Sequence, residues 1–95
     1  MAYFTGRVAV EFRCSGRWSG ISTTEARWWA FCLDGPDGRL GSMVWVHVAD
    51  LRRYVKRQVL KKNYVGGGDG GNADMVLVPV GELWRMGWAD PSSLV

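Results

Sequence analysis

Residues 5–33, TGRVAVEFRCSGRWSGISTTEARWWAFCL, join an alternating strand, a glycine-rich connection and an aromatic segment. In the first part, Val8, Val10 and Phe12 alternate with charged or small residues, the period-two pattern of a half-buried strand. Glu11 is therefore expected on the face opposite to Phe12. The glycines and serines of residues 15–22 then predict that the backbone turns.

A helix start follows this turn. Thr23 and Thr24 offer hydroxyl N-caps, and Glu25 would lie in the first helical turn. The pattern predicts a short helix that runs into a strand over residues 29–33.

The rest of the chain contains a hairpin and one long helix. Residues 34–38, DGPDG, predict a turn between the apolar runs 29–33 and 42–48, and hence an antiparallel hairpin. From Ala49 the apolar period becomes helical, with Leu51, Val55 and Val59 on one stripe and an expected end near Asn63. A last strand over residues 76–80 leads into a second short helix that Glu82 opens.

These elements predict one domain over residues 1–95, with a tail at 89–95 that frays. Its class is α/β or α+β: a mixed sheet of about four strands with one long basic helix and two short helices. Cys14 and Cys32 are interpreted as buried apolar residues of strands. The predicted core is Val8, Val10, Phe12, Phe31, Val44, Val46, Leu51, Val55, Val59, Val76 and Val78.

Positive charge is concentrated in the middle of the chain. The formal net charge is +3, and six basic residues fall between positions 52 and 62. This basic helix face is either simply solvated or contacts the phosphates of a polyanion, and both interpretations stay open. Because the chain has no run of eighteen apolar residues and no signal sequence, we expect a soluble intracellular protein without a membrane partner.

One tryptophan of the six is expected at the surface. Trp18 lies beside Arg17 and a Ser-Gly turn, so it is a stacking platform for a base, an anchor for a partner's pocket, or a lid over the strand. The glycine-rich loop with Gly67, Gly68 and Asp69 is either a linker or closes over a partner. The predicted contacts with a nucleic acid or partner are Arg13, Arg17, Trp18, Arg27, Arg52, Arg53, Lys56 and Arg57.

Several of these residues also form a family pattern. The matching positions are Thr5-Gly6, Glu11, Gly16, Ser19-Gly20-Ile21, Thr23-Thr24, Ala26 and Trp29, with Gly67-Gly68-Asp69 before the strand at 75–80. With this spacing the chain resembles the second half of small phage nucleases of the PD-(D/E)XK, or Holliday-junction-resolvase-like, superfamily. Such nucleases hold their metal with an aspartate and a Glu-x-Lys upstream of the Thr-Gly strand, where this sequence has only residues 1–4. The resemblance implies a nuclease-like domain without its catalytic half.

We therefore expect no catalytic residue and no cofactor. Glu11 would act, with magnesium, only if a second chain completed the site. Two functions stay open. The first is a phage-type protein that binds the DNA or RNA backbone through its basic helix. The second is a phage-encoded inhibitor, of the anti-CRISPR or anti-restriction type, that binds a bacterial defence protein. Either would work in the cytoplasm of an infected bacterium, and homodimerisation is left open.

Overall fold

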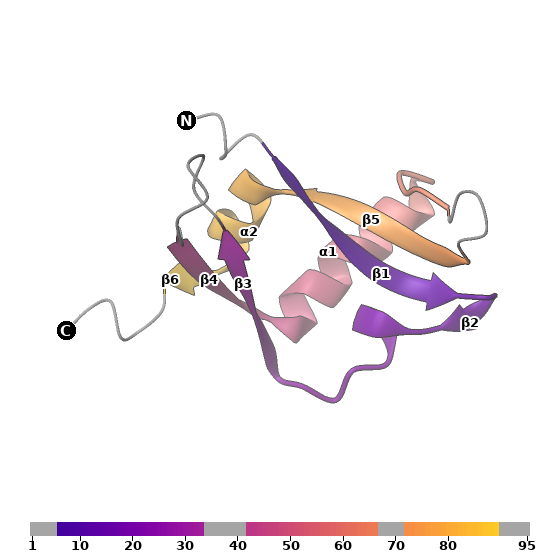
Figure 1. Cartoon of the computed structure of the whole chain (residues 1–95), viewed down its shortest axis with the longest axis horizontal. Coiled ribbons are helices and arrows are strands. Elements are labelled where there is room, and N and C mark those ends of the chain that lie inside the picture. The colour runs from indigo at the N-terminus through magenta and orange to yellow at the C-terminus, as the bar shows by residue number, and fades with distance from the viewer. Residues whose placement is uncertain (1–5, 34–41, 67–71, 90–95) are drawn as a thin grey trace.

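The computed structural model describes residues 6–33, 42–66 and 72–89. Figure 1 shows its elements, and the α+β class predicted from the sequence is confirmed. The elements are β1 (Arg7–Cys14), β2 (Arg17–Trp18), the 3-10 helix η2 (Gly20–Ser22), β3 (Trp28–Leu33), β4 (Ser42–His47), α1 (Val48–Leu60), β5 (Ala73–Pro79), α2 (Val80–Met86) and β6 (Trp88–Ala89).

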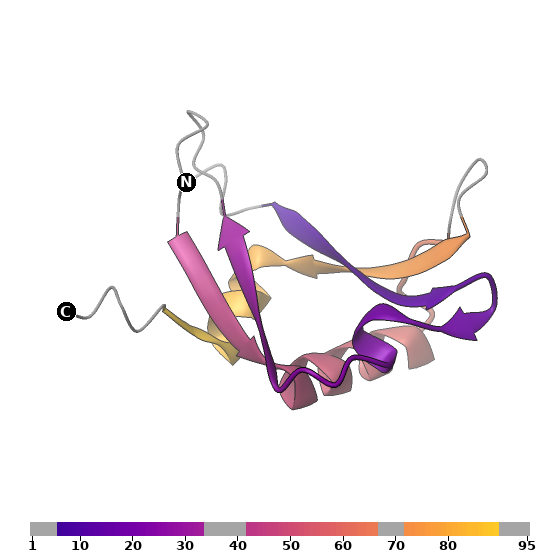
Figure 2. The ribbon, with the colours of Figure 1, turned by 60° about the horizontal axis from the view of Figure 1, so that its bottom comes forward.

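The strands form two sheets, so the single mixed sheet expected from the sequence is wrong. One sheet has the order β2-β1-β5 and the other the order β3-β4-β6, and all their pairs are antiparallel. A mixed sheet would need α1 to return the chain beside β4 as a parallel crossover. Instead α1 carries the chain from one sheet to the other, where β5 pairs with β1. In Figures 1 and 2, α1 lies alongside β1 and β5, and the β3–β4 hairpin lies at its N-terminal end.

The alternating strand predicted at the start of the chain is β1. Val10 pairs with Val76 and points into the core, as does Phe12 beyond it. The register shifts between Glu11 and Arg13, where a bulge bends the strand. Pro79 is the last residue of β5, at the edge of its sheet, as its missing N–H donor requires.

The hairpin between β3 and β4 is also confirmed, from Trp28 opposite His47 to Leu33 opposite Ser42. Its turn, with Asp34 and Asp37, lies outside the described residues. The prediction that residues 89–95 fray is wrong for Ala89, because Ala89 belongs to β6 and pairs with Val44 of β4.

The short helix expected at Thr23 is not formed. Helical geometry is confined to η2, which ends at Ser22, and no helix covers residues 23–27. The hydroxyl of Thr24 instead accepts hydrogen bonds from the backbone N–H of Ala26 (3.2 Å) and from the indole Nε1 of Trp29 (3.4 Å). Such local side-chain bonds compete with helix formation.

The long helix is confirmed as α1, but it ends at Leu60 rather than near Asn63. Lys62 has a φ of 58°, which is left-handed and stops the helix. None of the described helices is long and apolar enough to cross a membrane.

The predicted core is largely correct. Val8, Phe31 and Val59 are only partly buried against it, and Ile21, Val48, Val80 and Leu83 join it. The interpretation of the cysteines as buried is wrong: Cys14 is half-buried and Cys32 is exposed. Cys32 is exposed because it lies on the face of β3 opposite to Phe31, whose side chain packs against the core. Eight of the predicted residues are buried: Val10, Phe12, Val44, Val46, Leu51, Val55, Val76 and Val78.

Candidate functional site

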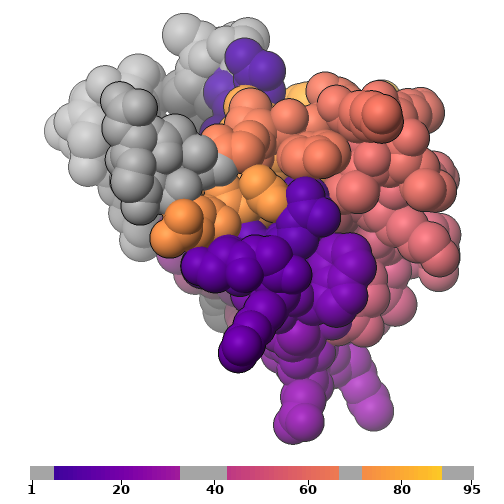
Figure 3. Space-filling view, turned by 90° about the vertical axis from the view of Figure 1, so that its right-hand side faces the viewer, coloured from indigo at the N-terminus to yellow at the C-terminus, as the bar shows by residue number. Residues whose placement is uncertain are grey.

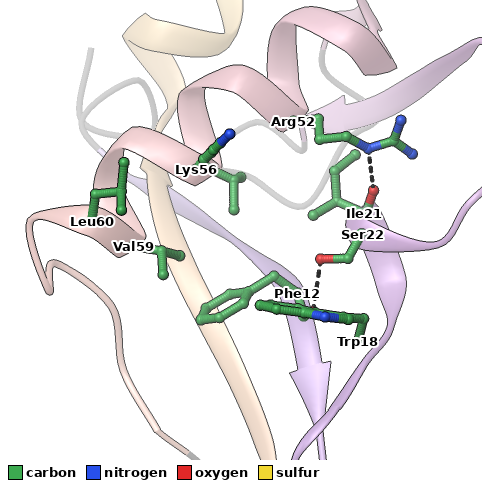
Figure 4. A pocket seen from close by; sticks show the side chains of 9 residues that line it. Phe12, Trp18, Ile21, Ser22, Arg52, Lys56, Val59 and Leu60 are labelled. Carbon is green, nitrogen blue, oxygen red and sulfur yellow. Dashed lines mark hydrogen bonds between the residues drawn. The ribbon is translucent and has the colours of Figure 1, made fainter.

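An apolar groove of about 400 Å³ lies between α1 and the segment formed by β1, β2 and η2. Figure 3 shows this side of the molecule, where the surface of β2 adjoins that of α1. We call this feature the α1–β2 groove (Figure 4). Its lining residues are Phe12, Trp18, Ile21, Ser22, Arg52, Val55, Lys56, Val59 and Leu60.

Two exposed apolar side chains flank the α1–β2 groove. Trp18 is 64% exposed and comes from β2, whereas Leu60 is 74% exposed and comes from the end of α1. A two-residue hairpin turn positions Trp18: Ser15 and Gly16 both have positive φ, as the two central residues of a type I′ turn require. The predicted exposure of Trp18 is therefore confirmed.

Two basic residues of α1 line the same groove, one turn apart. Arg52 is engaged by the protein itself, since its Nε–H donates to the carbonyl oxygen of Ile21 and its Nη2 to that of Thr24, each at 3.0 Å. Lys56 is exposed, and no ion pair joins it to a carboxylate among the described residues. Within the described part of the chain, the ammonium group of Lys56 is therefore the groove cation that is open to a ligand.

Arg13 is held within the fold. Its guanidinium pairs with Asp74 of β5 and lies 5.3 Å from the ring centroid of Phe12 and 5.8 Å from that of Tyr64. The hydrogen bond to Asp74 and, to a smaller extent, that to Tyr64 raise the pKa of Arg13 above its ordinary value. These contacts tie β1 to β5 and to the segment after α1.

The remaining predicted contact residues lie outside the groove lining. Arg53 pairs with Asp50 at 3.2 Å on the exposed side of α1, and Arg57 is exposed on the same helix. Arg17 is exposed in β2, and the guanidinium carbon of Arg27 lies 6.0 Å from the ring centroid of Trp28. The predicted loop with Gly67, Gly68 and Asp69 lies outside the described residues.

Glu11 has a structural contact. Its Oε2 accepts a hydrogen bond of 2.8 Å from the hydroxyl of Ser19, and the carboxylate is half-buried. The part of the chain that the structure describes contains no group of three or more histidine, cysteine, aspartate or glutamate residues that could hold a metal ion.

Gly20 and Ile21, two of the residues that carried the nuclease resemblance, have packing roles here. A Cβ on Gly20 would lie 2.3 Å from the carbonyl oxygen of Glu11, and the φ of Gly20 is +53°. Ile21 is fully buried, and the hydroxyl of Ser22 donates to the carbonyl of Phe12 at 2.8 Å. These contacts hold η2 against β1, and Ile21 and Ser22 of η2 line the groove.

Leu60 was not predicted from the sequence as part of the site. The signal was present, because Leu60 follows directly on the apolar stripe of α1 and precedes Lys61 on its basic side.

Comparisons with known proteins do not place the chain in a family: no family model, curated protein or solved structure matches it.

Proposed function

We propose that the protein binds single-stranded nucleic acid in the α1–β2 groove. Trp18 stacks on an unpaired base and Lys56 contacts a backbone phosphate. One observation carries this proposal: the same groove is lined by an exposed indole and by an ammonium group that has no carboxylate partner among the described residues. Aromatic platforms beside cations are the usual means of binding single strands.

The preference for a single strand follows from the indole. A ring can stack on a base face only where that face is not covered by the next base pair. Each stacked base contributes about 1 to 3 kcal/mol to binding. The exposed Arg57 and Lys61 extend the positive charge along α1 beyond Lys56.

A second candidate function rests on Leu60. An apolar side chain that is 74% exposed beside an apolar groove is also suited to anchor a side chain of a protein partner. The basic residues around it would then face an acidic surface. This is the arrangement that a phage inhibitor of a bacterial defence protein would need.

The test compares a labelled single-stranded oligonucleotide of about 16 nucleotides, the upper range of site sizes for one small domain, with the duplex of the same sequence. Fluorescence anisotropy is measured at several salt concentrations. We expect tighter binding of the single strand and a logarithmic salt slope of about 0.7 per phosphate contacted.

Lys56→Ala should lower that slope by about 0.7, the contribution of one phosphate contact. The matched control is Arg85→Ala, since Arg85 is an exposed cation of α2 that pairs with Glu82 and lies outside the groove. Equal slopes for both variants, or no binding of the single strand, would contradict the proposal. Absent nucleic-acid binding together with a saturable complex with a defence protein would favour the second candidate.

A further inference from the structure

Among the described residues, one edge of the strand β3 has no partner strand, and we call it the free edge of β3. This strand lies at the end of the order β3-β4-β6, and in Figures 1 and 2 no described strand runs along its other side. Its six residues, WWAFCL, contain no charge and no proline, and its register with β4 has no bulge.

The hydrogen bond from the N–H of Val48 to the carbonyl of Arg27 (2.9 Å) fixes which backbone groups face this edge. Residues 27 and 48 continue the β3–β4 register as a hydrogen-bonded pair. Along an antiparallel ladder, hydrogen-bonded pairs alternate with pairs whose N–H and C=O groups point away from the partner strand. Trp29 and Phe31 therefore direct their N–H and C=O groups to β4. Trp28, Ala30 and Cys32 direct theirs to the free edge, and no hydrogen bond among the described residues uses these groups.

The side chains of the same three residues form an apolar surface. Trp28 is 43% exposed, and Ala30 and Cys32 are exposed. Trp28 packs edge-to-face with His47 and with Trp88, at 5.8 and 6.5 Å between ring centroids. Natural monomers protect such an edge with charges, proline or a bulge, because unpaired strands of apolar residues associate. The described edge of β3 has none of these devices.

We propose that the free edge of β3 pairs antiparallel with β3 of a second copy of this chain. The three outward-directed residues are centred on Ala30. Pairing about a two-fold axis at Ala30 joins Ala30 to Ala30 of the second copy, and Trp28 to Cys32 in both directions. Every outward-directed N–H and C=O of these residues then forms a ladder bond.

The charge distribution favours the β3 edge as the place where two copies meet, and it disfavours a nucleic acid there. The chain carries a net charge of +3 and the exposed outer side of α1 is basic, so two copies repel each other over that surface. The β3 edge is uncharged, so two copies meet there without repulsion. An uncharged edge also offers no cation to the phosphates of a nucleic acid. The dimer joins the two β3-β4-β6 sheets into one, and it does not depend on the function proposed for the α1–β2 groove.

The first test uses Ala30→Pro. Proline removes only the N–H that points to the free edge, so the ladder to β4 stays complete. The matched control is Ala30→Val, which keeps this N–H. In sedimentation across a range of concentrations, we expect the parent and Ala30→Val to reach twice the mass of the 10.6 kDa chain, and Ala30→Pro to stay monomeric with an unchanged circular dichroism spectrum.

The second test is an oxidative cross-link, which also decides the matter if Ala30→Pro fails to fold. In a Cys14→Ser background, Ala30→Cys with Cys32→Ser should form a disulfide between copies, because hydrogen-bonded partners have Cα atoms about 5.5 Å apart. The Cys14→Ser chain with its natural Cys32 should not, because the two Cys32 residues would be four positions, about 13 Å, apart along the strands. A monomer at every concentration, a dimer that persists in folded Ala30→Pro, or cross-linking through Cys32 instead of position 30 would overturn the proposal.

Discussion

The guanidinium of Arg52 donates a hydrogen bond of 3.0 Å to the carbonyl oxygen of Ile21, and this bond joins α1 to η2. A second bond of the same length, to the carbonyl of Thr24, holds the connection that follows η2. The two neighbouring cations of the α1–β2 groove therefore differ in role. Arg52 shapes the groove, whereas Lys56 remains available to a ligand.

The first prediction separates these roles by stability. Arg52→Ala should lower the free energy of unfolding by about 1 kcal/mol, because two hydrogen bonds from a charged but solvent-exposed group are lost. Lys56→Ala should change it by less than about 0.5 kcal/mol, as is usual for exposed charges without partners. Urea denaturation of both variants measures the difference. Equal losses would show that Arg52 does not hold η2.

The second prediction concerns two glycines. Gly20→Ala forces a side chain into a left-handed conformation and against the carbonyl of Glu11, where backbone cannot yield. It should cost at least about 2 kcal/mol. The matched control is Gly81→Ala in α2, where an added Cβ meets nothing within 4 Å. This change should instead stabilise the protein by about 0.5 to 1 kcal/mol, because alanine loses less conformational freedom in a helix. Opposite shifts in melting temperature are expected, and a Gly20→Ala variant as stable as the parent would refute the packing of η2 on β1.

The elements that were correctly predicted are those with a local signal. Val10 and Phe12 alternate with polar or small residues in β1, and Leu51 and Val55 recur at helical spacing in α1. Nothing in these patterns says which strands pair. The partner of Val10 is Val76, more than sixty positions away, and the separation into two sheets follows from that long-range pairing.

The groove was predicted only in parts. The exposure of Trp18 and the basic face with Lys56 follow from the sequence, but their convergence does not. It requires η2 to lie between β1 and α1, and the contacts that place it there join Gly20 to Glu11 and Arg52 to Ile21. The short helix predicted after Thr23 is absent for a similar reason. A threonine hydroxyl can cap a helix, but here the hydroxyl of Thr24 accepts hydrogen bonds from a loop N–H and an indole N–H instead.

The third prediction concerns the alkaline limit of stability. Burial, followed by the negative charge of Glu82, raises the pKa of Tyr54 above its ordinary value of 10.0, and Arg57 opposes this in part. The folded state therefore favours the neutral phenol. Its stabilising contribution is complete below the unfolded pKa near 10 and is lost as the pH rises through the higher folded pKa.

The free energy of unfolding should consequently fall as the pH rises above about 10, and Tyr54→Phe should show a smaller fall. Urea denaturation across this range measures both curves. Identical curves for the parent and Tyr54→Phe would mean that another group sets the alkaline limit.

The most direct test of the binding proposal is the affinity of Trp18 variants for the single-stranded oligonucleotide. Trp18→Ala should weaken binding roughly 5- to 150-fold, the equivalent of one lost base stack, whereas Trp18→Tyr should retain most of it. Both variants should melt close to the parent, because the indole is 64% exposed. If Trp18→Ala binds within about twofold of the parent, an aromatic stack contributes nothing there and the proposed role of the groove is wrong.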